Sequence, residues 1–133
     1  EKIMAPEKEA AGLFVEDLKI QASKIPNKYL FQVTLVQQQL KRRYSKGYID
    51  LVFEGVAHSV AGDKTVKIQL ADVAELTKKD LKFSFQYFQT INGEFTLPAN
   101  FSPENVVVSA ILTKSRWQKY AKKDKSVSWQ ISQ

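Results

Sequence analysis

The chain of 133 residues contains no cysteine and only one histidine, His58. The lack of thiols excludes disulfide bonds, cysteine-ligated zinc, iron–sulfur centres and a cysteine nucleophile. A single histidine cannot supply a two-histidine metal site. Ser59 follows His58 directly, but neighbours along a strand point to opposite faces, so Ser59 is poorly placed as its partner. We therefore interpret His58 as an exposed or hydrogen-bonded residue at a strand end.

Recognisable catalytic and cofactor-binding motifs are also absent. The five glycines are scattered, and neither GxGxxG nor GxxxxGK[ST] occurs. The acidic residues do not show the spacing of a calcium loop. Asp50 and Glu54 lie four residues apart on one face of a predicted strand, but alternation with Leu51 and Phe53 makes them outward, solvated positions. We therefore predict that the protein is not an enzyme and has no catalytic residues, cofactor or metal site.

Long apolar runs are missing as well, and none approaches the ~20 residues that a membrane-spanning helix requires. No secretory leader opens the chain. Because the chain starts at Glu1 rather than at methionine, an anchor or leader ahead of Glu1 would not be visible in this sequence.

What the chain does contain is alternation of apolar and polar residues with a period of two, the pattern of half-buried β-strands. Asn92-Gly93 suits the positive φ angles of a tight turn, so we predict a hairpin over Leu81–Leu97 that turns there. Later in the chain the alternation returns, with Val106, Val108, Ala110 and Leu112 on one face. In the first half of the predicted hairpin, the shared face comprises Leu81, Phe83, Phe85 and Tyr87.

Together these stretches predict an all-β fold, an antiparallel β-sandwich of about seven to eight strands in a single domain. Pro26-Asn27 and Gly62-Asp63 mark two of its turns. The predicted domain covers residues 12–133, and residues 1–11 form a linker or the end of a preceding coiled coil, because Pro6 interrupts their helix formers. The inward residues of the sandwich are predicted to be Phe31, Val33, Leu35, Leu51, Phe53, Phe83, Phe85, Val106 and Val108.

Three segments fit this scheme less simply. In residues 12–22, Phe14, Leu18 and Ile20 share one face, while Val15 falls out of phase with them. Residues 71–79 are predicted to form either one helical turn or a loop. The last strand is predicted over residues 127–131, after a basic loop.

Positive charge is concentrated in two segments of a chain whose net charge is +6. Residues 41–46 contribute +4, and residues 114–125 contribute +5 from six basic residues and one acid. Such clusters either keep loops soluble and prevent edge strands from pairing with other chains, or they attract an anionic partner. Aromatic residues among them favour stacking on a ligand or, alternatively, packing of the loop onto the sandwich. The candidate anionic-ligand residues are Lys41, Arg42, Arg43, Trp117, Lys119, Tyr120, Lys122 and Lys123.

Short motifs are spread over nearly the whole chain, among them IMAP at residues 3–6, Val15-Glu16-Asp17-Leu18, Leu97-Pro98, Phe101-Ser102-Pro103 and Trp129. Together they resemble a domain family of unknown function from proteobacteria. The resemblance implies a membrane-anchored protein with one N-terminal transmembrane helix, a long coiled coil and then this β-domain. We therefore expect membrane contact only through that N-terminal anchor, which is missing here. The resemblance also implies a gene-level association with bactofilin-type cytoskeletal polymers of the cell envelope. It implies no catalytic residue.

Two functional hypotheses follow. In the first, the domain is a non-enzymatic interaction or scaffold module of a bacterial envelope protein that binds another protein and forms a homo-oligomer through an upstream coiled coil. In the second, it binds an anionic ligand such as nucleic acid, a lipid headgroup or a cell-wall polymer. Nucleic acid is the least favoured, because the sequence lacks the RNA-recognition signature and βαβ alternation. The predicted location is the periplasmic side of the inner membrane, with the cytoplasm as the alternative.

Overall fold

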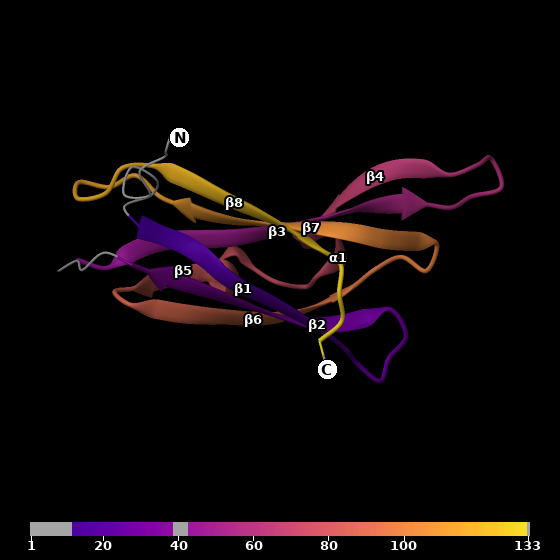
Figure 1. The fold of residues 1–133 in the computed structure, drawn as a ribbon, viewed down its shortest axis with the longest axis horizontal. Helices are drawn as coiled ribbons and strands as arrows, with labels where there is room; N and C mark the ends of the chain where they lie inside the picture. Colours follow the sequence, from indigo (N-terminus) through magenta and orange to yellow (C-terminus); the bar gives the residue numbers. More distant parts are fainter. Residues whose placement is uncertain (1–11, 39–42, 133) are drawn as a thin grey trace, which may run out of the picture.

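The computed structural model describes residues 12–38 and 43–132, which form two packed antiparallel sheets (Figure 1). This confirms the predicted single-domain sandwich. The first sheet has the order β1-β2-β6, and the second has the order β4-β3-β7-β8 with β5 also paired to β3. The eight strands described are β1 (Leu13–Ala22), β2 (Lys28–Gln37), β3 (Ser45–Ala57), β4 (Lys64–Gln69), β5 (Lys82–Phe85), β6 (Phe88–Thr96), β7 (Phe101–Leu112) and β8 (Ala121–Ser128).

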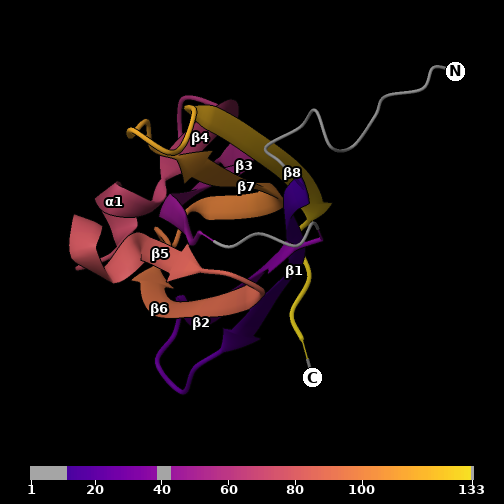
Figure 2. The ribbon, with the colours of Figure 1, turned by 90° about the vertical axis from the view of Figure 1, so that its left-hand side faces the viewer.

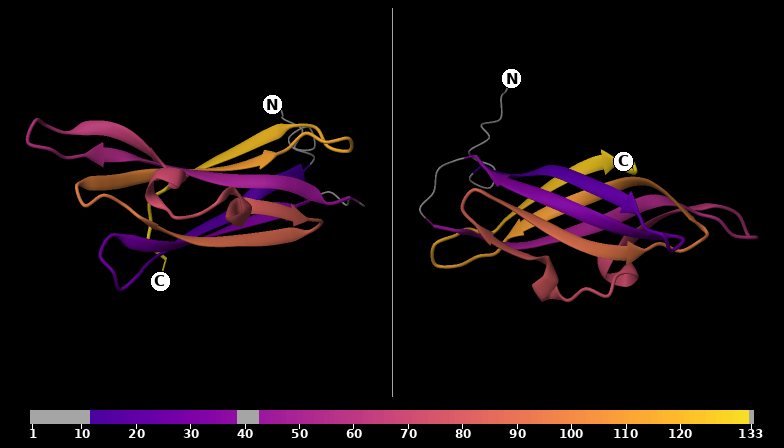
Figure 3. Two further views of the ribbon diagram at one scale, coloured as in Figure 1. Left: turned by 180° about the vertical axis from the view of Figure 1, so that it is seen from behind. Right: turned by 90° about the horizontal axis from the view of Figure 1, so that it is seen from below.

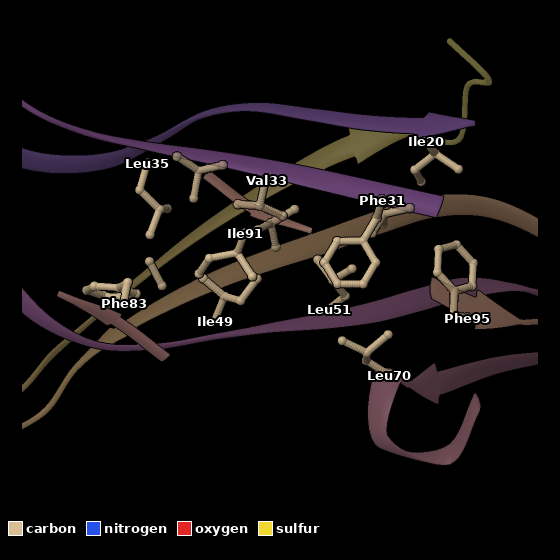
Figure 4. Close-up of a cluster of buried hydrophobic side chains, with 14 of the residues drawn as sticks. Ile20, Phe31, Val33, Leu35, Ile49, Leu51, Leu70, Phe83, Ile91 and Phe95 are labelled. Atoms are coloured by element: carbon tan, nitrogen blue, oxygen red, sulfur yellow. The ribbon is translucent and has the colours of Figure 1, made fainter. Parts of the chain in front are cut away.

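The core lies between the two sheets and is built by the predicted alternation. All nine residues predicted to face inward are buried. The ring of Phe53 from one sheet packs against that of Phe95 from the other, with centroids 4.5 Å apart. Tyr29 and Trp129 extend this cluster, since their ring centroids lie 5.1 Å apart in an edge-to-face arrangement. Figure 4 shows another part of the core, in which Phe31 and Phe95 are labelled. The hydrophobic contact between the sheets therefore includes an aromatic cluster that also anchors the segment after β8.

A β-bulge explains the phase change in the first strand. The register of β1 against β2 shifts between Val15 and Asp17. Before the bulge the odd-numbered Leu13 and Val15 are buried, and after it Ile20 is buried. The prediction that Phe14 shares the inward face of Ile20 is therefore wrong, because the extra residue of the bulge reverses the alternation.

The predicted hairpin over Leu81–Leu97 is wrong. Asn92 and Gly93 lie inside β6, where they pair with Gln32 and Phe31 of β2. Gly93 serves close packing instead of a turn, because a Cβ there would lie 2.7 Å from the Phe31 ring. The chain changes sheets after Phe85, so β5 pairs with β3 while β6 pairs with β2. Tyr87 lies at this crossing and is exposed, contrary to its predicted place beside Phe85.

The segment between β4 and β5 contains two short helices, α1 (Leu70–Val73) and the 3-10 helix η3 (Lys78–Leu81), where one helical turn or a loop was predicted. They lie along one side of the sandwich (Figure 3). Leu70 is fully buried. The Thr77 backbone N–H and hydroxyl both donate to Asp80, and these hydrogen bonds lower the pKa of that carboxyl below its ordinary value. No helix in the described part of the chain is long and apolar enough to cross a membrane.

The outer edge of β1 is partly covered by the end of the chain. The Ser132 backbone N–H donates to the Ile20 carbonyl at 2.7 Å. Lys125 of β8 directs its Nζ to the carbonyls of Val15 and Glu16, each at 3.4 Å, at the bulge. These contacts join the two sheets along this side and occupy backbone groups that an open edge strand would leave unpaired.

Replacing Phe85 by Ala removes a buried ring from the core and is expected to lower the free energy of unfolding by about 3–5 kcal/mol. Phe88→Ala is the matched control, because Phe88 is 67% exposed, and we expect a change within about 0.5 kcal/mol. Urea unfolding followed by circular dichroism measures both. Equal effects of the two substitutions would contradict the assignment of Phe85 to the core and of Phe88 to the surface.

Candidate functional site

The loop between β7 and β8 is an ordered turn that presents two residues at its tip. Ser115 and Gln118 form a bridge in which each backbone N–H donates to the other's carbonyl, at 2.8 and 3.4 Å. The Trp117 N–H donates to the Ser115 hydroxyl at 3.2 Å. Arg116 and Trp117 are therefore held at the corner of a tight turn and are exposed.

Gln118 fixes this turn to the start of β3. Its side-chain oxygen accepts from the Lys46 N–H at 3.0 Å, and its Nε2 donates to the Lys46 carbonyl at 2.8 Å. The same Nε2 also donates to the Thr113 carbonyl. One amide side chain thus satisfies both backbone groups of Lys46 and holds the two basic segments together.

The two basic segments meet at this point. The Arg43 guanidinium carbon lies 3.7 Å from the centroid of the Trp117 ring, and that of Arg116 lies 5.0 Å from it. Both distances fall in the range of cation–π attraction. A hollow of about 730 Å³ lies alongside, and we call it the Arg43–Trp117 groove; it is lined by Arg43, Tyr44, Lys46, Ser84, Thr113, Ser115, Arg116, Trp117 and Gln118.

The groove lies at one end of the sandwich. Figure 2 shows the ribbon viewed from that end. The register places Ser45 opposite Phe85 and Gly47 opposite Leu112, which brings residues 43–48, 84–89 and 112–120 to the same end. These three segments contain five basic residues and no acidic residue. We call this surface the aromatic–basic end, because its exposed residues also include Tyr44, Tyr87, Phe88, Trp117 and Tyr120.

The predicted site residues do not all reach this surface. Arg43 and Trp117 are in contact, and Lys119 and Tyr120 are exposed on the same loop. Lys41 and Arg42 lie outside the described residues. Lys122 and Lys123 belong to β8 and not to a loop, since that strand begins at Ala121. As strand neighbours they point to opposite faces, so they do not act as one cluster.

Lys122 also interacts electrostatically with a carboxylate inside the domain. It lies opposite Ile111 on β7, and its charge acts on Asp50 of β3. Burial raises the pKa of Asp50 above its ordinary value of 3.8, against the weaker lowering effects of the Leu51 backbone N–H and of Lys122. Lys122 therefore lies near enough to Asp50 to favour its ionised form weakly.

Several residues of this end were not predicted from the sequence. No sequence motif marks Arg116 or Gln118, because Arg116 is placed by a turn and Gln118 bonds a strand about 70 residues earlier in the chain. The adjacent aromatic residues Tyr87 and Phe88 do give a signal, since two neighbouring rings cannot both follow the inward alternation.

His58 lies at the opposite end and contacts two side chains. Its Nδ1 lies 3.0 Å from Asp63 Oδ1, and its Nε2 lies 2.8 Å from Ser102 Oγ. The partner serine is thus Ser102 rather than Ser59, and the exposed, hydrogen-bonded interpretation of His58 is confirmed. The hydrogen bonds run from Asp63 to His58 to Ser102, as in the triad of a hydrolase. All three side chains are exposed, however, and Ser102 is paired in the ladder between β3 and β7. We interpret it as a link that ties the β3–β4 connection to β7.

In the described part of the chain, no group of three or more acidic or histidine side chains is placed to hold a metal ion. Fold and site together define a β-sandwich domain with one aromatic–basic end. The chain belongs to DUF6776, a family of unknown function, whose model matches residues 1–108. This confirms the predicted kinship with a domain family of unknown function.

Among solved structures, the solution structure of CsgH from R. palustris matches with 11% identity and a TM-score of 0.29, covering 84% of this chain and 90% of that chain. A likeness of this size does not transfer a function. A search of curated proteins gave no match.

Replacing Gln118 by Ala removes the side-chain bonds to the Lys46 backbone, each of which stabilises the loop by about 0.5–1.5 kcal/mol. We expect amide hydrogen exchange to accelerate at Thr113, whose N–H donates to the Lys46 carbonyl at 3.2 Å, while the β2 core keeps its protection. Gln130→Ala is the control, an exposed glutamine beyond β8. Unchanged exchange at Thr113 would show that Gln118 does not hold the turn.

Asp50 predicts a pH-dependent contribution to stability. Its pKa is raised in the folded state, so folding favours the protonated carboxyl, and this contribution is lost as the pH rises through the raised pKa. Asp50→Asn should therefore gain stability relative to the native domain at pH 7 but not at pH 3. Urea unfolding at the two pH values measures the difference, and a gain that is equal at both would contradict the assigned cause.

Proposed function

We propose that this domain is a non-enzymatic interaction module that binds an anionic partner at its aromatic–basic end. The observation that carries the proposal is the contact of Arg43 with Trp117, which joins the two basic segments beside a groove. A guanidinium stacked on a ring keeps its N–H donors free at the edge to meet carboxylate or phosphate oxygens.

The charge distribution supports the same function. Five basic residues without an acidic neighbour in their segments create a positive potential that attracts anions and accelerates their association. Lys46, Ser84 and Ser115 add polar groups to the groove. The domain thus combines a positive potential, which attracts anions from a distance, with a groove that can contact them.

Other features support a binding role instead of catalysis. The His58–Asp63–Ser102 trio lies at the far end from the groove and is open to solvent. The resemblance to membrane-anchored envelope proteins supports a module on the periplasmic side of the inner membrane. There an upstream coiled coil would present it to an anionic surface, in an envelope assembly linked to bactofilin-type polymers.

Fluorescein-labelled poly-glutamate of about 20 residues is the simplest probe of the proposed function. We expect it to bind the domain at ~50 mM salt, where screening is weak, and to dissociate as the salt rises above ~300 mM. Arg43→Glu with Arg116→Glu should abolish the anisotropy change. Lys24→Glu with Lys64→Glu makes the same change of net charge elsewhere on exposed positions and should retain most of the binding. Equal loss in both double variants would contradict a site at this end.

A further inference from the structure

The exposed aromatic side chains extend well beyond the Arg43–Trp117 groove. Five aromatic residues of the aromatic–basic end are between 54% and 67% exposed. Only Tyr44 and Trp117 line the groove. The other three are Tyr87 and Phe88, at the crossing from β5 to β6, and Tyr120 on the β7–β8 loop. A segment bound in the groove alone would leave these three without a function.

An apolar row continues this surface onto the outer face of the first sheet. Phe14, Val36 and Phe88 lie directly opposite one another on β1, β2 and β6. Phe14 and Val36 are partly exposed, and Phe88 is the most exposed of the three. Exposed aromatic residues thus lie on both sheets at this end of the sandwich.

Basic residues are interleaved with these rings. Arg43 and Lys46 flank Tyr44, while Lys114, Arg116 and Lys119 surround Trp117 on the β7–β8 loop. Tyrosine and tryptophan prefer the boundary between lipid tails and water, because each ring carries an apolar body and a polar group. Basic residues near an anionic membrane are attracted to its surface. A broad end with both properties matches a lipid surface better than a single peptide or strand.

We infer that the aromatic–basic end docks onto an anionic phospholipid surface. This inference rests on the proposed function and names the partner as a membrane. Arg43, Lys46 and the loop bases face the phosphate groups, and Trp117, Tyr120 and Phe88 enter the headgroup region. The contact is additional to any N-terminal anchor and orients the domain with its His58 end away from the membrane.

Vesicle binding tests the inference with Trp117 as reporter. In a Trp129→Phe background, Trp117 is the only tryptophan. Vesicles of phosphatidylcholine with about 30% phosphatidylglycerol should co-sediment the domain and shift Trp117 emission to shorter wavelength. Brominated acyl chains in the same vesicles should quench that emission. Pure phosphatidylcholine vesicles should bind much more weakly.

Two pairs of variants separate charge from ring insertion. Arg43→Glu with Arg116→Glu should weaken vesicle affinity by at least about twenty-fivefold, from roughly fivefold per basic residue lost, while Lys24→Glu with Lys64→Glu should change it far less. Phe88→Ser with Tyr120→Ser should reduce affinity and quenching. Ile25→Ser with Val60→Ser, which removes exposed apolar residues elsewhere, should leave both unchanged. Circular dichroism confirms that each variant is folded.

The outcomes distinguish this inference from the proposed function. Binding to poly-glutamate without binding to anionic vesicles overturns the membrane inference and leaves an acidic protein segment as the partner. Stronger binding to a single-stranded oligonucleotide than to vesicles also overturns it. Binding to none of these probes at ~50 mM salt overturns both proposals. Vesicle binding that the matched controls weaken equally shows that this end is not the docking surface.

Discussion

The ladder between β3 and β7 is the constraint on which the rest of the structure depends. It runs from Gly47 opposite Leu112 to Ala57 opposite Phe101, with one bulge after Glu54. The strands approach so closely at Gly47 that a Cβ there would lie 1.8 Å from the Ile111 carbonyl oxygen. This approach brings Lys46 beside Thr113, where Gln118 can bond the backbone of both. At the other end the same ladder brings Ser102 to His58.

The two ends of the ladder have different chemistry. At one end, loops carry bases and exposed rings that no core contact requires. At the other, His58, Asp63 and Ser102 satisfy one another through hydrogen bonds. Exposed rings that lie outside the core mark a surface for contact, whereas mutually bonded polar groups stabilise local structure. The asymmetry is the physical basis for assigning function to the aromatic–basic end.

The sequence predicted the class of fold and its core well, because burial on one face of a sheet imposes a period of two that is visible in residues such as Phe31, Val33 and Leu35. It did not predict pairing. Asn92-Gly93 is compatible with a turn, but Gly93 lies in β6, where it leaves room for the Phe31 ring of the neighbouring strand. Arg43 and Trp117 were identified as candidates by composition. Their contact depends on the β3–β7 register, which no local pattern encodes.

Residue-specific mapping by NMR tests the central claim most directly. A ¹⁵N-labelled domain would be titrated with bicelles of phosphatidylcholine and phosphatidylglycerol, and amide shifts would be followed along the chain. The account predicts changes confined to residues 43–48, 84–89 and 112–120 and to Phe14 and Val36 beside Phe88, with β4 and the surroundings of His58 unchanged. Changes centred on β4 or on His58, with none at Trp117, would contradict it.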